Sequence, residues 1–482
     1  GLPEVTAAEE ASALRPYAPK VERRFGEPPP DLARKLAAID EDDMGFPISV
    51  NPVNAVNPVP TPTANSEPAT ANGQADFWGT NYDTYRLETR PVPEGSPMTA
   101  NAIKAIAPYL ISGNKGDLLG RHGTFYLNLV EPATVVLDAF GGAAIYTHFL
   151  AQQGALPAGS TWNEWEYSRS ITNRQIKDAP AAVVREVISI RQDFDTAFPV
   201  TESQPTREDT LLLRARIFEW VNQRLRATFP SPSRDAMGRF PLPDTPQTAA
   251  LYLFLQNHMA ENRVVDFDID DAGNPRLFTG GKPIGKDDLR FVRWNTVTNA
   301  MEHSRPSRIW GADMPTLIRD ASRRFAEATI RQGDGWQLAA DAPAGALVFV
   351  DTSYFPTDEQ TAAGAAVMNY GNTTLGDANP ALWFQKFEKY LLPKSQEVRY
   401  VITNNFNGRV VDQLEKAGWT VLRTFRGSPK KPSHEFIALS PAAVADIRLQ
   451  SAPARRYGPG GIPLGDSDGP FQTPTGGAAE DQ

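Results

Sequence analysis

The chain has 482 residues and a formal net charge of −9, and its length suits roughly two or three domains of ~150 residues each. It contains no cysteine, which excludes a disulfide framework, zinc–cysteine and iron–sulfur sites, and a cysteine nucleophile. The five histidines lack paired metal-ligand spacing, no apolar run approaches the ~20 residues of a membrane span, and the first residues lack signal-peptide features, so we expect no metal site, no membrane segment and no secretion.

Proline-rich sequence of low hydrophobicity occupies both ends of the chain. Residues 1–75 show no helical or strand period apart from a short amphipathic stretch at 30–39, and residues 451–482 are rich in glycine and proline. This composition is typical of extended chain. We interpret the two segments as arms, which are either passive linkers or attachment segments that become ordered on a partner.

Between the arms, short apolar runs alternate with amphipathic stretches. The predicted strands are at 133–140, 346–355, 397–406, 419–425 and 434–440, and helical patterns follow at 143–153 and 410–419. This alternation indicates an α/β fold with a mostly parallel sheet. In such sheets ligands bind beyond the carboxyl ends of the strands, so the polar residues that follow the apolar runs are the candidates for a site.

A long middle segment interrupts this alternation. It contains helical patterns at 207–225 and 248–259 and a turn-rich stretch at 264–283. We therefore expect a first core part at 76–190, an inserted, mostly helical subdomain at 191–325, and a second core part at 326–450.

Polar residues and glycines follow the first strand and the next strand end. Asp138 ends the first apolar run, and Gly141 and Gly142 precede a helix, where they allow a ligand to approach the helix N–H groups. Glu164 comes about 20 residues later, the offset at which dinucleotide-binding folds hold a ribose hydroxyl. A tight turn and an exposed acidic loop explain these features equally well.

Two further aspartates stand near aromatic residues. Asp334 is followed by Trp336, and Asp351 ends a second apolar run and precedes Thr352, Ser353 and Tyr354. A carboxylate beside an aromatic ring can accept a hydrogen bond from an exocyclic amine while the ring stacks on a base. An Asx turn at the end of the strand is the alternative interpretation.

Taken in order, these motifs resemble those of the Dam-like adenine-N6 DNA methyltransferases, which use S-adenosylmethionine (SAM). The resemblance covers about residues 110–442 and rests on DAFGGAAIYTHFL, NEWEYSR, GDGW, VFVDTSYF and the closing strand–helix–strand and hairpin. It implies a Rossmann-like SAM-dependent methyltransferase fold. The implied cofactor-binding residues are Lys115, Asp138, Phe140, Gly141, Gly142, Glu164, Asp334 and Trp336. Among these, Lys115 in SGNKGDLLG is a loose substitute for the family's Gly-Gly-Lys motif.

The catalytic segment resembles the family's Asp-Pro-Pro-Tyr motif but lacks both prolines. The resemblance implies that Asp351 and the Thr352 carbonyl hold the target amino group and that Tyr354 or Phe355 stacks on the adenine, with Ser353 completing the tetrad. Thr-Ser is a freer backbone than Pro-Pro, and lost preorganisation lowers the rate. The chemistry requires neither a metal nor a covalent nucleophile.

The middle segment resembles the family's target-recognition helix and hairpin, which implies double-stranded DNA as partner. Arg263, Arg276 and Lys282 are the implied DNA-binding residues. The acidic net charge argues against general nucleic-acid binding, because phosphates favour basic surface, but it leaves room for a local basic cleft. An ordinary solvated helix face is the alternative interpretation.

Two functions remain open at this point. The first is a SAM-dependent DNA adenine-N6 methyltransferase, as in restriction–modification, that acts on a flipped-out base. The second is a catalytically inactive methyltransferase-like protein, structural or nucleic-acid-binding, that residues 1–75 and 451–482 tether to other subunits of an assembly such as a phage virion. The corresponding locations are the bacterial cytoplasm and the phage particle.

Overall fold

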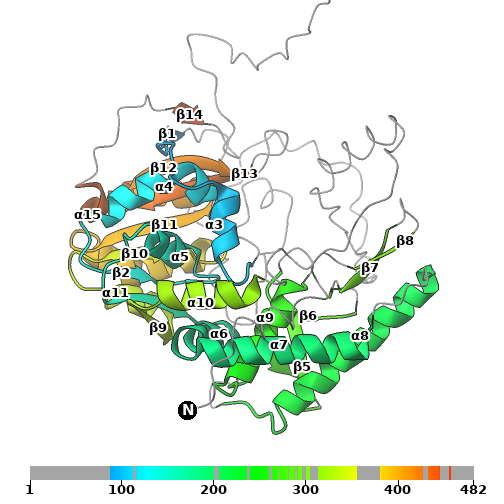
Figure 1. Ribbon diagram of the computed structural model, residues 1–482. Coiled ribbons are helices and arrows are strands. Elements are labelled where there is room, and N and C mark those ends of the chain that lie inside the picture. The colour runs from blue at the N-terminus through cyan, green and yellow to red at the C-terminus, as the bar shows by residue number, and fades with distance from the viewer. Residues whose placement is uncertain are drawn as a thin grey trace, which may run out of the picture. The chain divides into compact units, whose positions relative to one another are not determined.

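The structure is a computed structural model and is shown in Figure 1. It describes residues 87–111, 115–199, 206–235, 239–259, 263–270, 272–279, 282–286, 288–289, 291–295, 300–303, 313–354, 380–426, 433–445 and 455–457. The expected N-terminal arm at 1–75, with its short helix at 30–39, lies outside the described residues. So does all of the expected C-terminal arm except Arg455–Tyr457.

The helices and strands follow one another through the described part of the chain. The strands are β1 (Leu87–Pro91), β2 (Val136–Asp138), β3 (Ser160–Glu164), β4 (Asp266–Ile269), β5 (Pro275–Thr279), β6 (Lys282–Pro283), β7 (Val292–Asn295), β8 (Ala300–His303), β9 (Ala328–Gln332), β10 (Leu347–Val350), β11 (Arg399–Asn405), β12 (Thr420–Arg426), β13 (Ser433–Leu439) and β14 (Arg455–Tyr457). The α-helices are α3 (Ala100–Ile106), α4 (Gly116–Val130), α5 (Ile145–Gln152), α6 (Tyr167–Asp178), α7 (Pro180–Ala197), α8 (Arg207–Thr228), α9 (Pro246–Asn257), α10 (Met314–Arg324), α11 (Gly335–Ala340), α13 (Pro380–Lys386), α14 (Gly408–Lys416) and α15 (Pro441–Val444).

A nine-stranded sheet organises the fold, in the order β14-β1-β12-β13-β11-β10-β2-β3-β9. Neighbouring strands from β11 through β10, β2 and β3 to β9 are parallel, and β13 runs antiparallel between β11 and β12. The predicted α/β class with a mostly parallel sheet is therefore confirmed, and the arrangement is compatible with a Rossmann-like fold. The five predicted strands are all present. The sequence patterns considered above do not predict β1, β9 or β14.

Both faces of the sheet are covered by helices. Successive residues of a strand point to opposite sides, so each strand contributes side chains to both faces. In β10, Leu347 and Phe349 belong to one buried cluster, whereas Val348 and Val350 belong to the other. The first cluster contains residues of α3, α4, α5, α6, α7, α8, α9 and α10, and the second contains residues of α11, α13 and α14. The continuous apolar runs in the sequence are thus strands buried on both faces.

Local signals set the limits of α14, which links β11 to β12. The Asn407 side chain accepts a hydrogen bond from the Val410 N–H at the start of the helix. Gly418 follows the end of the helix with φ of +82°, a conformation that glycine adopts without strain. The chain can therefore turn directly from the helix into β12.

The described part of the middle segment combines helices with small antiparallel sheets. Helices α8, α9 and α10 accompany the three-stranded sheet β4-β5-β6 and the hairpin β7-β8. Residues Thr248–Asn257 of α9 are buried, and their apolar members belong to the same cluster as the first face of the large sheet. The inserted subdomain with its own boundaries at 191–325 therefore stays a prediction.

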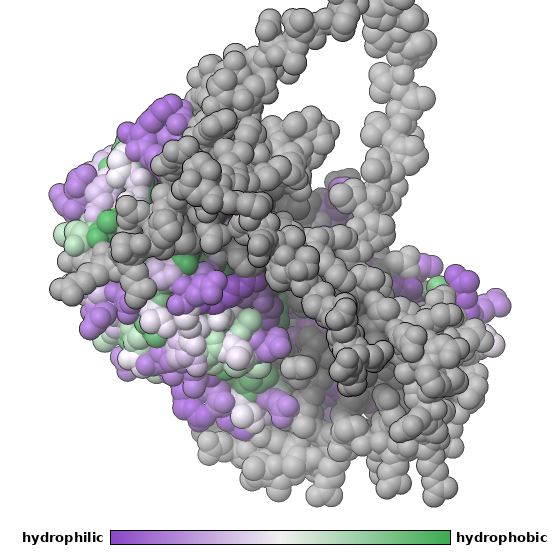
Figure 2. Space-filling view, turned by 90° about the horizontal axis from the view of Figure 1, so that it is seen from above, coloured by the Kyte–Doolittle hydropathy of each residue, from purple (hydrophilic) through white to green (hydrophobic). Residues whose placement is uncertain are grey.

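Polar and apolar residues are interspersed on the face of the described part that Figure 2 shows. Figure 2 shows purple hydrophilic residues beside smaller green areas on one face of the molecule. Among the described residues, Leu211, Leu212 and Leu382 are the large hydrophobic side chains that are exposed. No helix in this part of the chain is long and apolar enough to cross a membrane.

Because β13 lies between β11 and β12, we predict that replacing a leucine of β13 by alanine lowers the free energy of unfolding far more than replacing an exposed leucine. Leu439 of β13 is fully buried, whereas Leu212 of α8 is 60% exposed. We expect Leu439→Ala to lower the free energy of unfolding by about 2–5 kcal/mol, since it leaves a cavity. The matched control, Leu212→Ala, should change it by no more than ~0.5 kcal/mol. Denaturant unfolding of the full chain measures both, and equal losses would contradict the packing described for β13.

Candidate functional site

One cavity of about 260 Å³ opens at the carboxyl ends of β2, β3 and β10. All twelve residues that the sequence predicts for catalysis and cofactor binding line it: Lys115, Asp138, Phe140, Gly141, Gly142, Glu164, Asp334, Trp336, Asp351, Thr352, Ser353 and Tyr354. These residues come from segments far apart in the chain, and the sheet brings them together.

The position of this cavity follows from the order of the strands. β2 and β10 are adjacent and parallel, but β2 leads into α5 on one face, whereas α13, the next described helix after β10, packs on the other. A crevice forms where neighbouring connections leave in opposite directions, and ligands of open α/β sheets bind there.

The loop after β2 requires its glycines for close packing. A Cβ atom at Gly141 would lie 1.9 Å from Nε1 of Trp162, and Gly142 has φ of +50°. Ala144, at the start of α5, is left-handed as well, with φ of +57°. This strained turn holds the backbone of the loop against the cavity.

Glu164 at the end of β3 is the acidic residue expected at the second strand end. Its carboxylate accepts hydrogen bonds from the N–H groups of Gly142 (3.1 Å), Trp165 (2.8 Å) and Glu166 (3.1 Å). The guanidinium of Arg169 donates a fourth bond at 3.0 Å. Glu164 therefore joins β3, the glycine loop and α6 around one buried charge.

Two buried oxygen atoms at the cavity have no hydrogen-bond partner among the described residues. They are Oδ1 of Asp138 and Oδ1 of Asn163. The other oxygen of Asp138 accepts a bond from Thr147 at 3.3 Å, and the amide nitrogen of Asn163 donates to the carbonyls of Ala139 and Gly333. Unpaired buried acceptors are costly and rare, so a ligand with donor groups would satisfy them.

The buried position of Asp138 raises the pKa of its carboxyl from 3.8 to about 8. Desolvation is the main cause, and the negative charge of Asp351 adds to it. A neutral carboxyl is therefore the main form of Asp138 at neutral pH.

Asp334 has a local structural role in addition to its place at the cavity. Its side chain accepts the N–H of Trp336 at 2.8 Å and so caps α11. Trp336 itself is buried and packs edge to face against Phe140 and Trp383. Gly335 lets this loop approach β2, because a Cβ there would lie 2.4 Å from the Ala139 carbonyl oxygen.

The tetrad after β10 is anchored by side chains from other elements. The Thr352 hydroxyl accepts hydrogen bonds from Nε1 of Trp383 (3.0 Å) and from the amide of Asn404 (3.3 Å). The same Asn404 amide donates to the Ser353 carbonyl at 3.1 Å. α13 and β11 therefore restrain this stretch of backbone.

Lys115 contacts the tetrad directly. Its buried ammonium lies 2.9 Å from the Asp351 carboxylate and donates a hydrogen bond to the Tyr354 hydroxyl. It also lies 4.3 Å from the centre of the Tyr354 ring. The residue expected at the cofactor thus borders the cavity from the side of the predicted catalytic residues.

The predicted DNA-binding residues do not line this cavity. Arg263 forms an ion pair with Asp288 at 2.9 Å, and Arg276 of β5 forms one with Asp270 at 2.6 Å. Lys282 is exposed on β6. The cavity does reach this region of the chain, because Val264 lines it.

Several lining residues are not among the sequence candidates. Asn163, Arg169 and Lys386 belong to the cavity, and Asn404 orients the tetrad beside it. Asn163 could have been found, because it directly precedes Glu164 at the same strand end. Nothing local distinguishes Arg169, Lys386 or Asn404 from ordinary helix and strand residues.

Comparison with known proteins adds no assignment: no protein-family model matches the chain, and no curated protein matches it. Within the described residues, no group of three or more His, Cys, Asp or Glu side chains could hold a metal ion. The site must therefore be interpreted from its own geometry.

The raised pKa of Asp138 predicts a pH dependence of stability. The folded state holds this proton more tightly than the unfolded state. The contribution of Asp138 to stability is therefore fully present below pH 3.8. This contribution is lost as the pH rises toward about 8. Over that interval Asp138 alone contributes a decline of up to ~1.4 kcal/mol per pH unit.

We expect Asp138→Asn to flatten part of this decline, because asparagine resembles the protonated acid. Chemical denaturation of the full chain at acidic and at alkaline pH measures the effect. Asp341→Asn, at an exposed position, is the control and should keep the wild-type slope. An unchanged slope in Asp138→Asn would show that Asp138 is ionised in the folded protein.

Proposed function

We propose that the chain is a SAM-dependent methyltransferase that acts on N6 of adenine in double-stranded DNA. The observation that carries this proposal is the convergence of all twelve predicted cofactor and catalytic residues on one cavity at the β2–β10 switch point. The parallel order of the strands brings the residues at their carboxyl ends to one edge of the sheet, and Lys115 reaches the same cavity from the segment before α4.

The residues around the cavity suit the different parts of SAM. The Oδ1 atom of Asn163, and that of Asp138 once its carboxyl has lost its proton, can accept hydrogen bonds from an ammonium group, and Glu164 would meet the ribose hydroxyls. Asp334 and Trp336 are the candidates to contact the adenine ring. When bound, SAM supplies an electrophilic methyl group.

The tetrad suits the target base. The target adenine must leave the duplex stack to reach a pocket. The Asp351 carboxylate and the Thr352 carbonyl would accept the two N–H groups of its exocyclic amine, and the Tyr354 ring would stack on the base. This arrangement orients the nitrogen lone pair and requires no covalent nucleophile.

Lys115 would compete with the target amine for Asp351. Its ammonium already contacts this carboxylate at 2.9 Å. The base must therefore share the carboxylate with Lys115 or displace it. In either case Lys115 holds the carboxylate and the Tyr354 hydroxyl on the same side of the cavity before the base enters.

The β4-β5-β6 sheet is the proposed DNA-contacting element. It carries Arg276 and Lys282, and the segment just before it carries Arg263 and the cavity-lining Val264. Because Arg263 and Arg276 are paired with aspartates, phosphates would have to compete with these carboxylates. We therefore expect a salt-sensitive, modest contribution from each arginine.

The first experiment is calorimetric titration of the full chain with SAM, with variants at Asp334. Asp334→Asn keeps an oxygen that can cap α11 but removes the charge, whereas Asp334→Ala removes both. If the carboxylate holds the cofactor adenine, both variants lose affinity by roughly 10- to 100-fold. If Asp334 acts only as a cap, Asp334→Asn binds like the wild type. The absence of SAM binding by the folded wild-type chain would overturn the proposal.

The second experiment measures methyl transfer to adenine-containing duplex DNA. We expect Asp351→Asn to reduce transfer by at least about 100-fold, because the amide removes a charged acceptor from the amino group. Its SAM affinity should stay close to that of the wild type. Asp412→Asn on α14 is the control, since Asp412 pairs only with the neighbouring Lys416 among the interactions described here.

SAM binding without any transfer by the wild type would support the alternative function. The chain would then be a methyltransferase-like structural or nucleic-acid-binding protein. The contact of Lys115 with Asp351 is the observation that favours this second candidate, because it occupies an acceptor that the reaction needs.

A further inference from the structure

Arg169 lies between the cavity and the small antiparallel sheet of the middle segment. Arg169 lies in the first turn of α6, and its side chain is largely buried. Its guanidinium contacts Glu164 at 3.0 Å and 2.9 Å, and it reaches Asp266 of β4 at 3.3 Å. One cation therefore joins a cavity-lining carboxylate to a carboxyl of the β4-β5-β6 sheet.

The two carboxylate oxygens of Glu164 are unequally occupied. Oε1 accepts hydrogen bonds from the N–H groups of Trp165 and Glu166 and from the Arg169 guanidinium, whereas Oε2 accepts one from the N–H of Gly142. A carboxylate oxygen offers about two lone-pair sites, so Oε1 has none to spare. A ligand whose two adjacent hydroxyl groups meet both oxygens must therefore displace one of the donors at Oε1.

Arg169 is the donor most easily displaced. The three N–H groups belong to the glycine loop and to the backbone that leaves β3, so they cannot move without rebuilding the turn. The guanidinium has a second carboxyl within reach. In addition, its Nε–H is buried and makes no hydrogen bond despite lying 2.9 Å from Glu164, so its present geometry leaves one donor unsatisfied.

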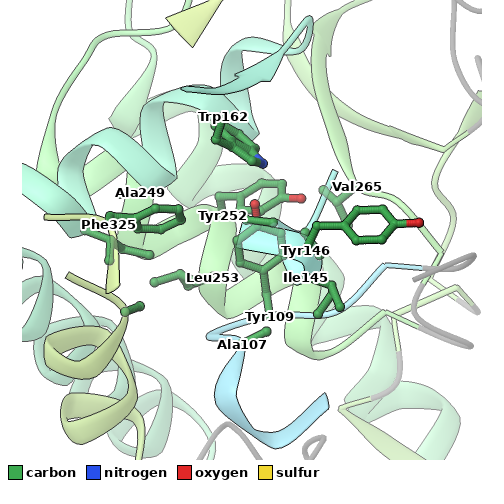
Figure 3. Close-up of a cluster of buried hydrophobic side chains, with 14 of the residues drawn as sticks. Ala107, Tyr109, Ile145, Tyr146, Trp162, Ala249, Tyr252, Leu253, Val265 and Phe325 are labelled. Carbon is green, nitrogen blue, oxygen red and sulfur yellow. The ribbon is translucent and has the colours of Figure 1, made fainter. Parts of the chain in front are cut away.

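Asp266 is the second carboxyl that the guanidinium can contact. Desolvation by burial is the main cause that raises the pKa of the Asp266 carboxyl, and the negative charge of Glu166 adds to this rise. The positive charge of Arg169 opposes it. The groups that face it are Arg169 and Glu166 of the α6 region, Glu164 of β3 and Tyr252 of α9. In Figure 3, Tyr252 lies beside Tyr109 in the buried cluster, and Val265, the residue before Asp266, borders the same group.

We propose that Arg169 is a positioning residue that couples the cavity to β4. A ligand whose hydroxyl groups take up the lone pairs of Glu164 releases the guanidinium toward Asp266. This inference rests on the proposed function, since the ribose of SAM carries the two adjacent hydroxyls that would compete with Arg169. The closer cation favours the ionised form of Asp266, and the proton of that carboxyl passes to the buffer.

The test is a count of the protons released when SAM binds. The full chain is titrated calorimetrically at neutral pH in two buffers of different ionisation enthalpy. We expect the wild type to release up to about one proton more than Asp266→Asn. Asp268→Asn, on the same strand but paired with Arg234, is the matched control and should release as many protons as the wild type.

Any proton that Asp138 releases on meeting SAM is common to all three proteins, so it cancels in the comparison. Equal proton release from the wild type and Asp266→Asn, with SAM bound in both, would overturn this inference alone. The absence of SAM binding by the wild type would overturn both this inference and the proposed function.

A second measurement needs no variant and covers the case in which Asp266→Asn does not fold. The unmodified chain is titrated with adenosine and with 2′,3′-dideoxyadenosine. Proton release with adenosine only is expected, because the dideoxy compound cannot compete for Glu164. Equal release with both compounds, or no binding of adenosine, would contradict the displacement of Arg169.

Discussion

The reversal of connections between β2 and β10 is the constraint on which the rest of the site depends. The described helices that follow these two adjacent parallel strands, α5 and α13, pack on opposite faces, and a crevice forms at the carboxyl ends of such strands. The glycine loop and the tetrad therefore border the same space. Glu164 and the Asp334 loop extend it, because β3 and β9 continue the parallel order beyond β2.

The buried polar groups that line this cavity lower the stability of the fold. Asp138, Asn163 and Arg169 each have a buried polar atom without a hydrogen bond within the described chain. A core formed only for packing would be expected to carry apolar residues at such positions. Their retention beside one cavity agrees with a binding site whose partner is a small polar molecule, and such departures from local stability are typical of functional sites.

The fold class and most of the cavity could be predicted because both depend on short local patterns. Apolar runs predict buried strands, and parallel strands bring residues such as Asp138 and Asp351 to one edge. The contacts of Lys115 with Tyr354, of Arg169 with Asp266 and of Asn404 with Ser353 could not be predicted, because they join residues 239, 97 and 51 positions apart. Only the arrangement of helices and strands in space determines such pairs. The insertion of β13 between β11 and β12 is of the same kind.

In the proposed methyltransferase, Thr352 and Ser353 in place of two prolines would affect the rigidity of the tetrad more than its chemistry. The amino group of a base would meet the Asp351 carboxylate and the Thr352 carbonyl, and neither acceptor depends on a proline ring. What proline supplies is a fixed backbone. Here Trp383 and Asn404 hold the Thr352 hydroxyl, and Asn404 also holds the Ser353 carbonyl. Hydrogen bonds from two neighbouring elements would thus replace a covalent restraint, so the order of this segment would depend on the packing of α13 against β11.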